Sequence, residues 1–193
     1  ELKADFEWAK SIAVGPGLSM NGVAAELTRC VLEREDKVRI LDADALNIIA
    51  AEHIDYKGSS EGKIIITPHI MEMSRLTGKT VADIKEHMIE SAKEYAIQHS
   101  CICILKDART VVTDGQKVYI NCTGNDGMST GGCGDVLTGL IAGMTAMGLD
   151  AFEAACLSVY VHGKAGDYAA AGKGRAGMTA ADISEAIAYV LKR

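Results

Sequence analysis

Short apolar runs separated by helical patterns constrain the fold of this chain more than any other feature of the sequence. Residues 64–66 and 101–105 are continuously apolar, and such runs are typical of parallel strands that are covered on both faces. Residues 11–14 and 38–41 are two further short runs, and apolar residues at helical spacing lie between them, as in a strand–helix–strand unit. We therefore expect an α/β fold with a mainly parallel sheet.

The remaining segments predict a hairpin and a series of helices. Residues 110–113 and 117–120 flank Asp114-Gly115-Gln116, which is typical of a hairpin with a three-residue loop. Periodicity and capping residues predict helices over 81–96, from Gly131 to Gly148, from Asp150 to about 171, and after Thr179. No linker separates the strands from the helices, so we expect residues 1–193 to form a single domain with its ligand beyond the carboxyl ends of the strands.

Composition excludes several classes of function. The 193 residues are 48% apolar, which is enough for a substantial buried core. Twenty Lys and Arg against 26 Asp and Glu leave a net charge of −6, with no basic cluster, so we expect no nucleic-acid partner. No apolar run approaches the roughly 20 residues that cross a bilayer. The first ten residues are too charged for a signal peptide, so we expect a cytoplasmic protein with no membrane partner.

The six cysteines show neither a CxxC pair nor a zinc-ligand spacing with histidine. We therefore expect reduced thiols rather than disulfides or a zinc site.

The glycine-rich segment Gly124–Gly139 carries the strongest chemical signal. Gly131, Gly132 and Gly134 precede Asp135 at the predicted start of a helix. Backbone N–H groups and the positive end of the helix dipole are therefore open to an anion such as a phosphate. A carboxylate there suits a base that takes a proton from a hydroxyl attacking phosphorus. The alternative is a glycine-rich turn in which Asp135 only complements the helix dipole.

Polar residues also follow two of the predicted strands. His69 and Glu72 lie three residues apart and share one side of a first helical turn. They could contact a substrate and a Mg²⁺-bound water, or form an exposed pair at a helix start; two ligands are too few for zinc. Lys106 and Arg109 follow the fourth strand and suit the phosphates of a nucleotide, although a lysine at a strand end is usually just solvated.

Three further motifs leave alternatives open. Gly15-Pro16-Gly17-Leu18 is either a ligand loop or a plain tight turn. Residues 42–47, with the sequence DADALN, form part of a site or hold a helix N-cap at Asp44. For residues 162–167, with the sequence HGKAGD, we favour helix packing through small residues over a functional role.

Taken in order, these motifs resemble those of the ADP/ATP-dependent NAD(P)H-hydrate dehydratases, a family of ribokinase-like repair enzymes. The resemblance runs from Gly15 onward and rests on GPGL, DADALN, TPHxxEMSRLTG, LKxAxT, GNxGMxTGGxGDVLTG and HGxAGD. It implies a ribokinase-like three-layer αβα sandwich. It also implies dehydration of (6S)-hydrated NADH or NADPH with ADP or ATP as co-substrate, through phosphorylation of the C6 hydroxyl and elimination of phosphate.

The resemblance also implies roles for individual residues. Asp135 would be the catalytic base and would contact the substrate together with Gly17 and His69. Glu72 would help to hold Mg²⁺ through water. The residues expected to bind the nucleotide are Lys106, Asp107, Ala108, Arg109, Thr110, Asn125, Gly132, Cys133 and Gly134.

Members of this family carry a further stretch before the GPGL motif, which supplies the first strands. We therefore expect the domain to lack its N-terminal strands, because that part was removed, left out or is supplied by a separate chain. An apolar sheet edge would then be exposed, so we expect residues 1–193 not to fold stably alone. The expected partners are hydrated NAD(P)H, an adenine nucleotide and further copies of the chain in a homo-oligomer.

Two other functions remain open at this point. A small-molecule kinase of the same fold, of the hydroxyethylthiazole or hydroxymethylpyrimidine type, shares the GxGD site, although TPHxxE and DADALN favour the dehydratase. The other alternative is a catalytically silent protein that binds nucleotides.

Overall fold

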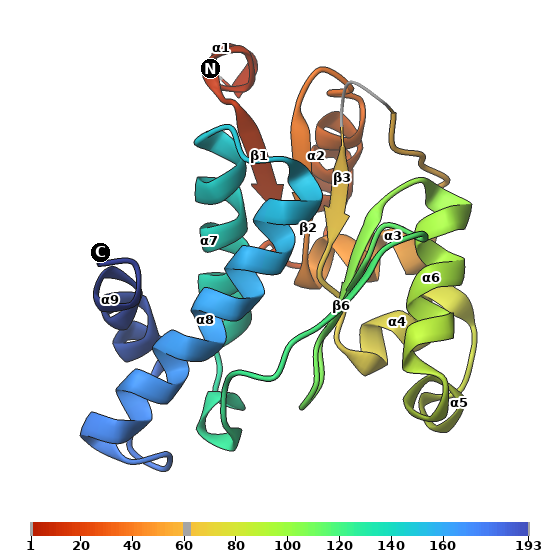
Figure 1. Cartoon of the computed structure of the whole chain (residues 1–193). Helices are drawn as coiled ribbons and strands as arrows, with labels where there is room; N and C mark the ends of the chain where they lie inside the picture. The colour runs from red at the N-terminus through yellow and green to blue at the C-terminus, as the bar shows by residue number, and fades with distance from the viewer. Residues whose placement is uncertain (1, 60–62, 193) are drawn as a thin grey trace.

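The computed structural model describes residues 2–59 and 63–192 and contains a six-stranded sheet (Figure 1). The strands lie side by side in chain order; the first four are parallel, β5 runs antiparallel to β4, and β6 runs antiparallel to β5. This arrangement confirms the expected α/β fold and the expected hairpin. The strands are β1 (Ser11–Val14), β2 (Val38–Leu41), β3 (Ile64–Ile66), β4 (Ile102–Leu105), β5 (Val111–Thr113) and β6 (Val118–Ile120).

Helices cover both faces of the sheet and make three layers (Figure 1). The helices packed on one face are α2 (Gly22–Leu32), α3 (Ala43–Glu52), α4 (Ile70–Thr77), α5 (Val81–Glu86) and α6 (Met88–His99). The opposite face is covered by α7 (Cys133–Ala146) and α8 (Ala151–Lys173), and α9 (Ala180–Val190) packs against these two helices. A short helix, α1 (Leu2–Trp8), precedes β1.

Alternating strand residues build the two cores. Ile40 and Ile65 face α7 and α8, whereas Leu41, Ile64 and Ile66 face the helices on the other side. All five side chains are fully buried, as expected for central parallel strands with both faces covered. The continuous apolar runs of the sequence are therefore explained by burial on both sides.

The helix predicted over residues 81–96 is divided into α5 and α6 at His87. The backbone of His87 leaves the helical region (φ −126°, ψ 49°), and its N–H donates to the Asp83 carbonyl to close α5. Ile84 and Ala92 nevertheless face the same core and are both fully buried. The period of the apolar residues thus predicted the buried face correctly but did not show the break.

Helix α8 lies very close to the loop that joins β6 to α7. A Cβ atom on Gly163 would lie 2.2 Å from Thr123 Oγ1, and one on Gly166 would lie 2.3 Å from Met128 Sδ. Both approaches are shorter than real Cβ contacts. At Gly163 the neighbours include the Thr123 backbone, so only glycine allows the loop to sit there, whereas at Gly166 the neighbour is the flexible end of Met128. Close packing at small residues is thus present in 162–167, but His162 and Gly163 also line a cavity, so the preference for packing over a functional role stays a prediction.

His162 lies in the same part of α8 and is buried. Burial lowers the pKa of His162 to about 4, so the ring is neutral at physiological pH. Its Nε2 atom has no hydrogen-bond partner within the part of the chain that the structure describes. Protonation of His162 therefore lowers the free energy of unfolding of the protein.

All six cysteines are free thiols, as expected. Among residues 2–59 and 63–192 no helix combines the length and the apolar character needed to cross a membrane.

Replacing Gly163 with Ala should destabilise the protein. The new methyl group would collide with the backbone of Thr123, and overpacking of this kind costs about 1–3 kcal/mol. The matched control is Gly172→Ala in the same helix, where a Cβ meets nothing within 4 Å and the higher helix propensity of Ala adds up to about 1 kcal/mol. Urea denaturation measures the free energy of unfolding of both variants. Equal stability of the two variants would contradict the close contact.

The stability of the protein should fall as the pH is lowered from about 6.5 to about 4, because the unfolded His162 takes up a proton that the folded state excludes. The shift corresponds to roughly 3 kcal/mol. His162→Gln should flatten the pH dependence in this window. His87→Gln, which changes an exposed histidine, should not. The measurement is the free energy of unfolding against pH, and an unchanged slope in His162→Gln would show that His162 titrates normally.

Candidate active site

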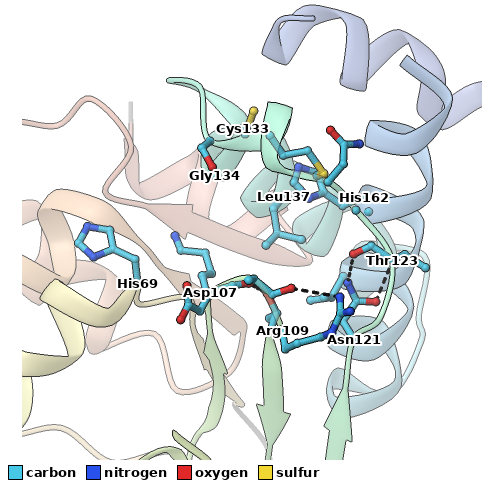
Figure 2. A pocket seen from close by; sticks show the side chains of 18 of the residues that line it. His69, Asp107, Arg109, Asn121, Thr123, Cys133, Gly134, Leu137 and His162 are labelled. Carbon is cyan, nitrogen blue, oxygen red and sulfur yellow. Dashed lines mark hydrogen bonds between the residues drawn. The ribbon is translucent and has the colours of Figure 1, made fainter. Parts of the chain in front are cut away.

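A cavity of about 750 Å³ opens at the carboxyl ends of the parallel strands. Residues from the loops after β2, β3, β4 and β6 and from helices α7 and α8 line it. Figure 2 shows His69 on one side of the cavity and Asn121 and Thr123 on the other, with Cys133 and Gly134 at the start of α7. This is the position in which α/β sheets generally bind their ligands.

The N-terminus of α7 enters this cavity without a side-chain cap. Gly132 occupies the N-cap position in the left-handed region (φ 87°) and, having no side chain, accepts no hydrogen bond from the first turn through one. Gly134 and Asp135 follow directly and both line the cavity. The orphan N–H groups and the helix dipole are thus available to an anion, as the sequence predicted.

Lys106 supplies a positive charge at the same place. Its backbone follows β4, and its N–H donates to the Pro68 carbonyl (2.8 Å), which ties the ends of β3 and β4 together. A Cβ atom on Gly134 would lie 3.5 Å from Lys106 Nζ. An anion at the start of α7 would therefore also face the ammonium group of Lys106.

Asp42 lies beneath Lys106 and is 1% exposed. Its Oδ1 accepts a hydrogen bond from Lys106 Nζ (2.9 Å), and its Oδ2 accepts one from Thr138 Oγ1 (2.7 Å). Burial raises the pKa of Asp42, but the Lys106 charge and the hydrogen bonds from Thr67, Lys106 and Thr138 outweigh it and leave the pKa below its usual value. Asp42 is therefore an anion that is part of the site.

His69 and Glu72 form a capping box at the start of α4. His69 Nδ1 accepts from the backbone N–H groups of Met71 and Glu72, and Glu72 Oε2 accepts from the N–H of His69 (2.8 Å). Glu72 Oε1 lies 3.4 Å from His69 Nε2. The His69 side chain is 50% exposed, whereas that of Glu72 is 5% exposed. His69 thus presents its ring to the cavity, and Glu72 holds the ring in place.

The loop after β4 forms another edge of the cavity. Residues 107–109 are exposed, and Thr110 Oγ1 donates to the Asp107 carbonyl (3.3 Å) and closes the turn. The N–H of Asn121 donates to the Thr110 carbonyl (2.9 Å), which ties this turn to the loop after β6. This exposed, cation-bearing turn is accessible to a ligand in the cavity.

Asp167 on α8 fixes the start of the glycine-rich loop. Its carboxylate accepts hydrogen bonds from Gly124 N and from Asn125 Nδ2, both at 3.1 Å. Asn125 Oδ1 in turn accepts from Gly127 N (3.1 Å) and caps a 3₁₀ turn at Asp126–Met128. The Asn125 side chain is therefore engaged within the loop, while the residue still lines the cavity.

Cys133 is the first residue of α7 and is buried beside the cavity. Burial raises the pKa of its thiol, and the nearby Asp135 carboxylate raises it further. The thiol is therefore protonated at neutral pH and is a poor nucleophile.

The structure brings most of the predicted site residues into this one cavity. They are His69, Glu72, Lys106, Asp107, Ala108, Arg109, Thr110, Asn125, Cys133, Gly134 and Asp135. Gly132 adjoins the cavity as the N-cap of α7. Gly17 does not line the cavity and lies in the exposed loop between β1 and α2 (φ 64°), so its role in substrate binding stays a prediction.

Sequence reasoning did not name several residues of the cavity wall, among them Asp42, Thr123 and His162. Asp42 belongs to the DADALN motif, which the sequence offered either as part of a site or as a helix N-cap at Asp44, and its carboxylate pairs with Lys106. Helix α3 begins after Asp42, and Asp44 instead accepts from the N–H of Ser19 (2.8 Å). Thr123 and His162 also line the cavity; the HGKAGD motif was their signal, since it places His162 and the contact of Gly163 with Thr123 on one turn.

A magnesium ion could be held here only in part by the protein. No group of three His, Cys, Asp or Glu side chains that could hold a metal is found within residues 2–59 and 63–192. Both oxygens of Glu72 already face His69. A magnesium ion in this cavity would keep several waters and take its direct ligands from nucleotide phosphates.

Comparison with known proteins places the chain in a family. A sequence model described as NAD(P)H-hydrate dehydratase matches residues 2–189. A bifunctional NAD(P)H-hydrate repair enzyme of Moorella thermoacetica is 45% identical over 183 residues, which are 94% of this chain and 34% of that protein. An ADP-dependent (S)-NAD(P)H-hydrate dehydratase of Neisseria meningitidis is 33% identical over 190 residues, which are 96% of this chain and 63% of that protein.

Solved structures agree with the sequence comparison. The ADP/ATP-dependent NAD(P)H-hydrate dehydratase of Bacillus subtilis, co-crystallised with ATP/Mg²⁺, has a TM-score of 0.83 and 32% identity over 94% of this chain and 63% of that chain. A hydroxyethylthiazole kinase of Pyrococcus horikoshii has a TM-score of 0.76 at 15% identity, which shows a shared fold alone. The chain spans about a third of the length of the bifunctional relative and less than two thirds of the single-function one. The chain belongs to the NAD(P)H-hydrate dehydratase family.

Proposed function

We propose that the protein dehydrates hydrated NADH or NADPH in a reaction that consumes ADP or ATP. The observation that carries this proposal is the convergence of an uncapped helix start, the Lys106 ammonium group and the Asp135 carboxylate in one cavity. The family supports it, because the Neisseria relative is named an ADP-dependent dehydratase and the Bacillus relative was crystallised with ATP/Mg²⁺. The names of these relatives, together with this cavity, make the dehydratase the best-supported function.

The first step transfers a phosphoryl group to the substrate. Asp135 removes the proton of the C6 hydroxyl, and the oxygen then attacks the terminal phosphorus of the nucleotide while the bond from that phosphorus to the bridging oxygen breaks and releases AMP or ADP. The backbone N–H groups at Gly132–Gly134 and the ammonium group of Lys106 stabilise the negative charge of the transferred group. Asp135 is exposed at the cavity and can meet the hydroxyl directly.

The second step eliminates the phosphate. Phosphate is a better leaving group than hydroxide, and the lone pair of the ring nitrogen helps to expel it as the C6–O bond breaks. Loss of a proton from C5 then restores the ring double bond. His69, whose ring is fixed by Glu72 at the opposite side of the cavity, is the proposed contact of the hydrated dinucleotide, with Gly17 at its outer end.

The nucleotide occupies the other part of the cavity in this proposal. The turn 107–110, Asn125 and Cys133 would contact it beside Lys106 and the start of α7. When bound, Mg²⁺ would neutralise charge on the phosphates, and Glu72 would contact its water shell. The homo-oligomer, the cytoplasmic location and the limits of the domain stay predictions.

A small-molecule kinase and a silent nucleotide-binding protein are the alternatives. The likeness to the thiazole kinase shows the fold alone, and no feature of the cavity favours a vitamin precursor over a dinucleotide. The two alternatives predict different products. A kinase would accumulate a phosphorylated substrate, and a silent protein would bind ADP or ATP without turnover.

Asp135→Asn should lower turnover of hydrated NADH by about 10²- to 10⁴-fold, the range for losing a general base, while the affinity for ADP stays the same or rises. Glu153→Gln is the matched control, because Glu153 holds the same third position of α8 and lies outside the cavity. Recovery of dihydronicotinamide absorbance measures turnover. Full activity of Asp135→Asn would refute the assignment of the base.

Gly134→Ala should lower the affinity for ADP by about 10- to 100-fold, because the methyl group fills the space in front of charge-assisted phosphate contacts. The folded protein tolerates this methyl group, whose nearest neighbour is Lys106 Nζ at 3.5 Å. Gly139→Ala, in the same helix with open space around it, is the control and should bind ADP normally. Isothermal titration gives both affinities. Unaltered ADP binding by Gly134→Ala would place the phosphates elsewhere.

A further inference from the structure

A buried carboxylate beside an anion site is electrostatically unexpected. Asp42 is 1% exposed, and a Cβ atom on Gly134 would lie 3.8 Å from its Oδ2. A negative charge at this distance from the start of α7 repels a phosphate bound there. Its presence therefore calls for a role other than raising the affinity for the nucleotide.

The contacts of Asp42 show what the carboxylate does to its neighbours. It bonds Lys106 Nζ after β4 through one oxygen and Thr138 Oγ1 on α7 through the other. Asp42 itself follows β2, and its backbone N–H donates to the Val14 carbonyl at the end of β1 (3.1 Å). One side chain thus connects the ends of the strands with the helix that carries Gly134 and Asp135.

Lys106 needs such a partner to hold one position. A lysine side chain has many rotamers, and confining it costs conformational entropy. The Lys106 side chain is 21% exposed, so it is not confined by burial alone. The ion pair with Asp42 directs Nζ to the space in front of Gly134, where the transferred group would lie.

We propose that Asp42 is a positioning residue, which holds the Lys106 ammonium group against the N-terminus of α7 so that it meets the transferred phosphoryl group. This inference rests on the proposed function. Asp42 does not touch the substrate and acts through Lys106. Its negative charge weakens ground-state attraction for the nucleotide, whereas the fixed geometry of Lys106 favours the transition state.

This role predicts opposite effects on binding and on catalysis. Asp42→Asn should lower kcat by about 10- to 100-fold, the factor associated with a hydrogen bond to a charged group. The same variant should bind ADP as tightly as the parent or more tightly, because a nearby negative charge is gone. A merely structural defect of the cavity would instead weaken ADP binding together with kcat, and that result would overturn the proposal.

A double-mutant cycle separates action through Lys106 from independent action. In a Lys106→Met background, Asp42→Asn should cause no further loss of kcat, since the group it positions is absent. An equal loss in both backgrounds would overturn the proposal. Lys106→Met alone leaves a buried unpaired carboxylate, so the double variant should also unfold at a higher temperature than this single variant. That comparison remains informative if one single variant folds poorly.

A third readout does not depend on turnover. The rate of Lys106 acetylation by acetic anhydride, followed by mass spectrometry, should rise in Asp42→Asn because the amine is released from its ion pair. Thr138→Val removes the other hydrogen bond of the same carboxylate and should leave this rate unchanged. An unchanged rate in Asp42→Asn overturns the proposal. If the parent protein fails to convert hydrated NADH but the rates differ as expected, the proposed function fails and the positioning of Lys106 stands.

Discussion

The uncapped N-terminus of α7, pressed against the carboxyl ends of the strands, is the interaction on which the site depends. Its first turn has no side-chain cap and begins at a glycine with a positive φ. A helix start of this kind needs an external acceptor for its N–H groups. The ion pair of Lys106 with Asp42 lies beside this helix start. The anion site therefore combines the dipole of α7 with the ammonium group of Lys106.

The rest of the fold keeps this helix start in place. Leu137 and Ile141 of α7 pack on the sheet face formed by Ile40 and Ile65, which sets the height of the helix above the strand ends. On the other side, Asp167 of α8 holds Gly124 and Asn125, and the glycines of α8 let the loop approach closely. The first part of the loop before α7 is therefore anchored to α8.

Sequence patterns predicted the elements well because their causes are local. The apolar run Ile64–Ile66, for example, reflects burial on both faces, and the Thr179 capping box marks the start of α9. The break at His87 was missed because the apolar period continues through it. For the site, the polar residues after the strands and the glycine-rich segment were expected to meet beyond the carboxyl ends of the strands, and they line one cavity there. The partnership of Asp42 with Lys106 joins positions 64 residues apart, and no local pattern reveals such a contact.

The most direct test of this account is a crystal structure of the protein soaked with a non-hydrolysable ATP analogue and Mg²⁺. The account predicts that the terminal phosphate accepts hydrogen bonds from main-chain N–H groups at the start of α7 and from Lys106 Nζ, with the Asp135 carboxylate facing the phosphorus. Phosphates bound away from Gly134 and Lys106, with the analogue elsewhere in the cavity, would contradict it.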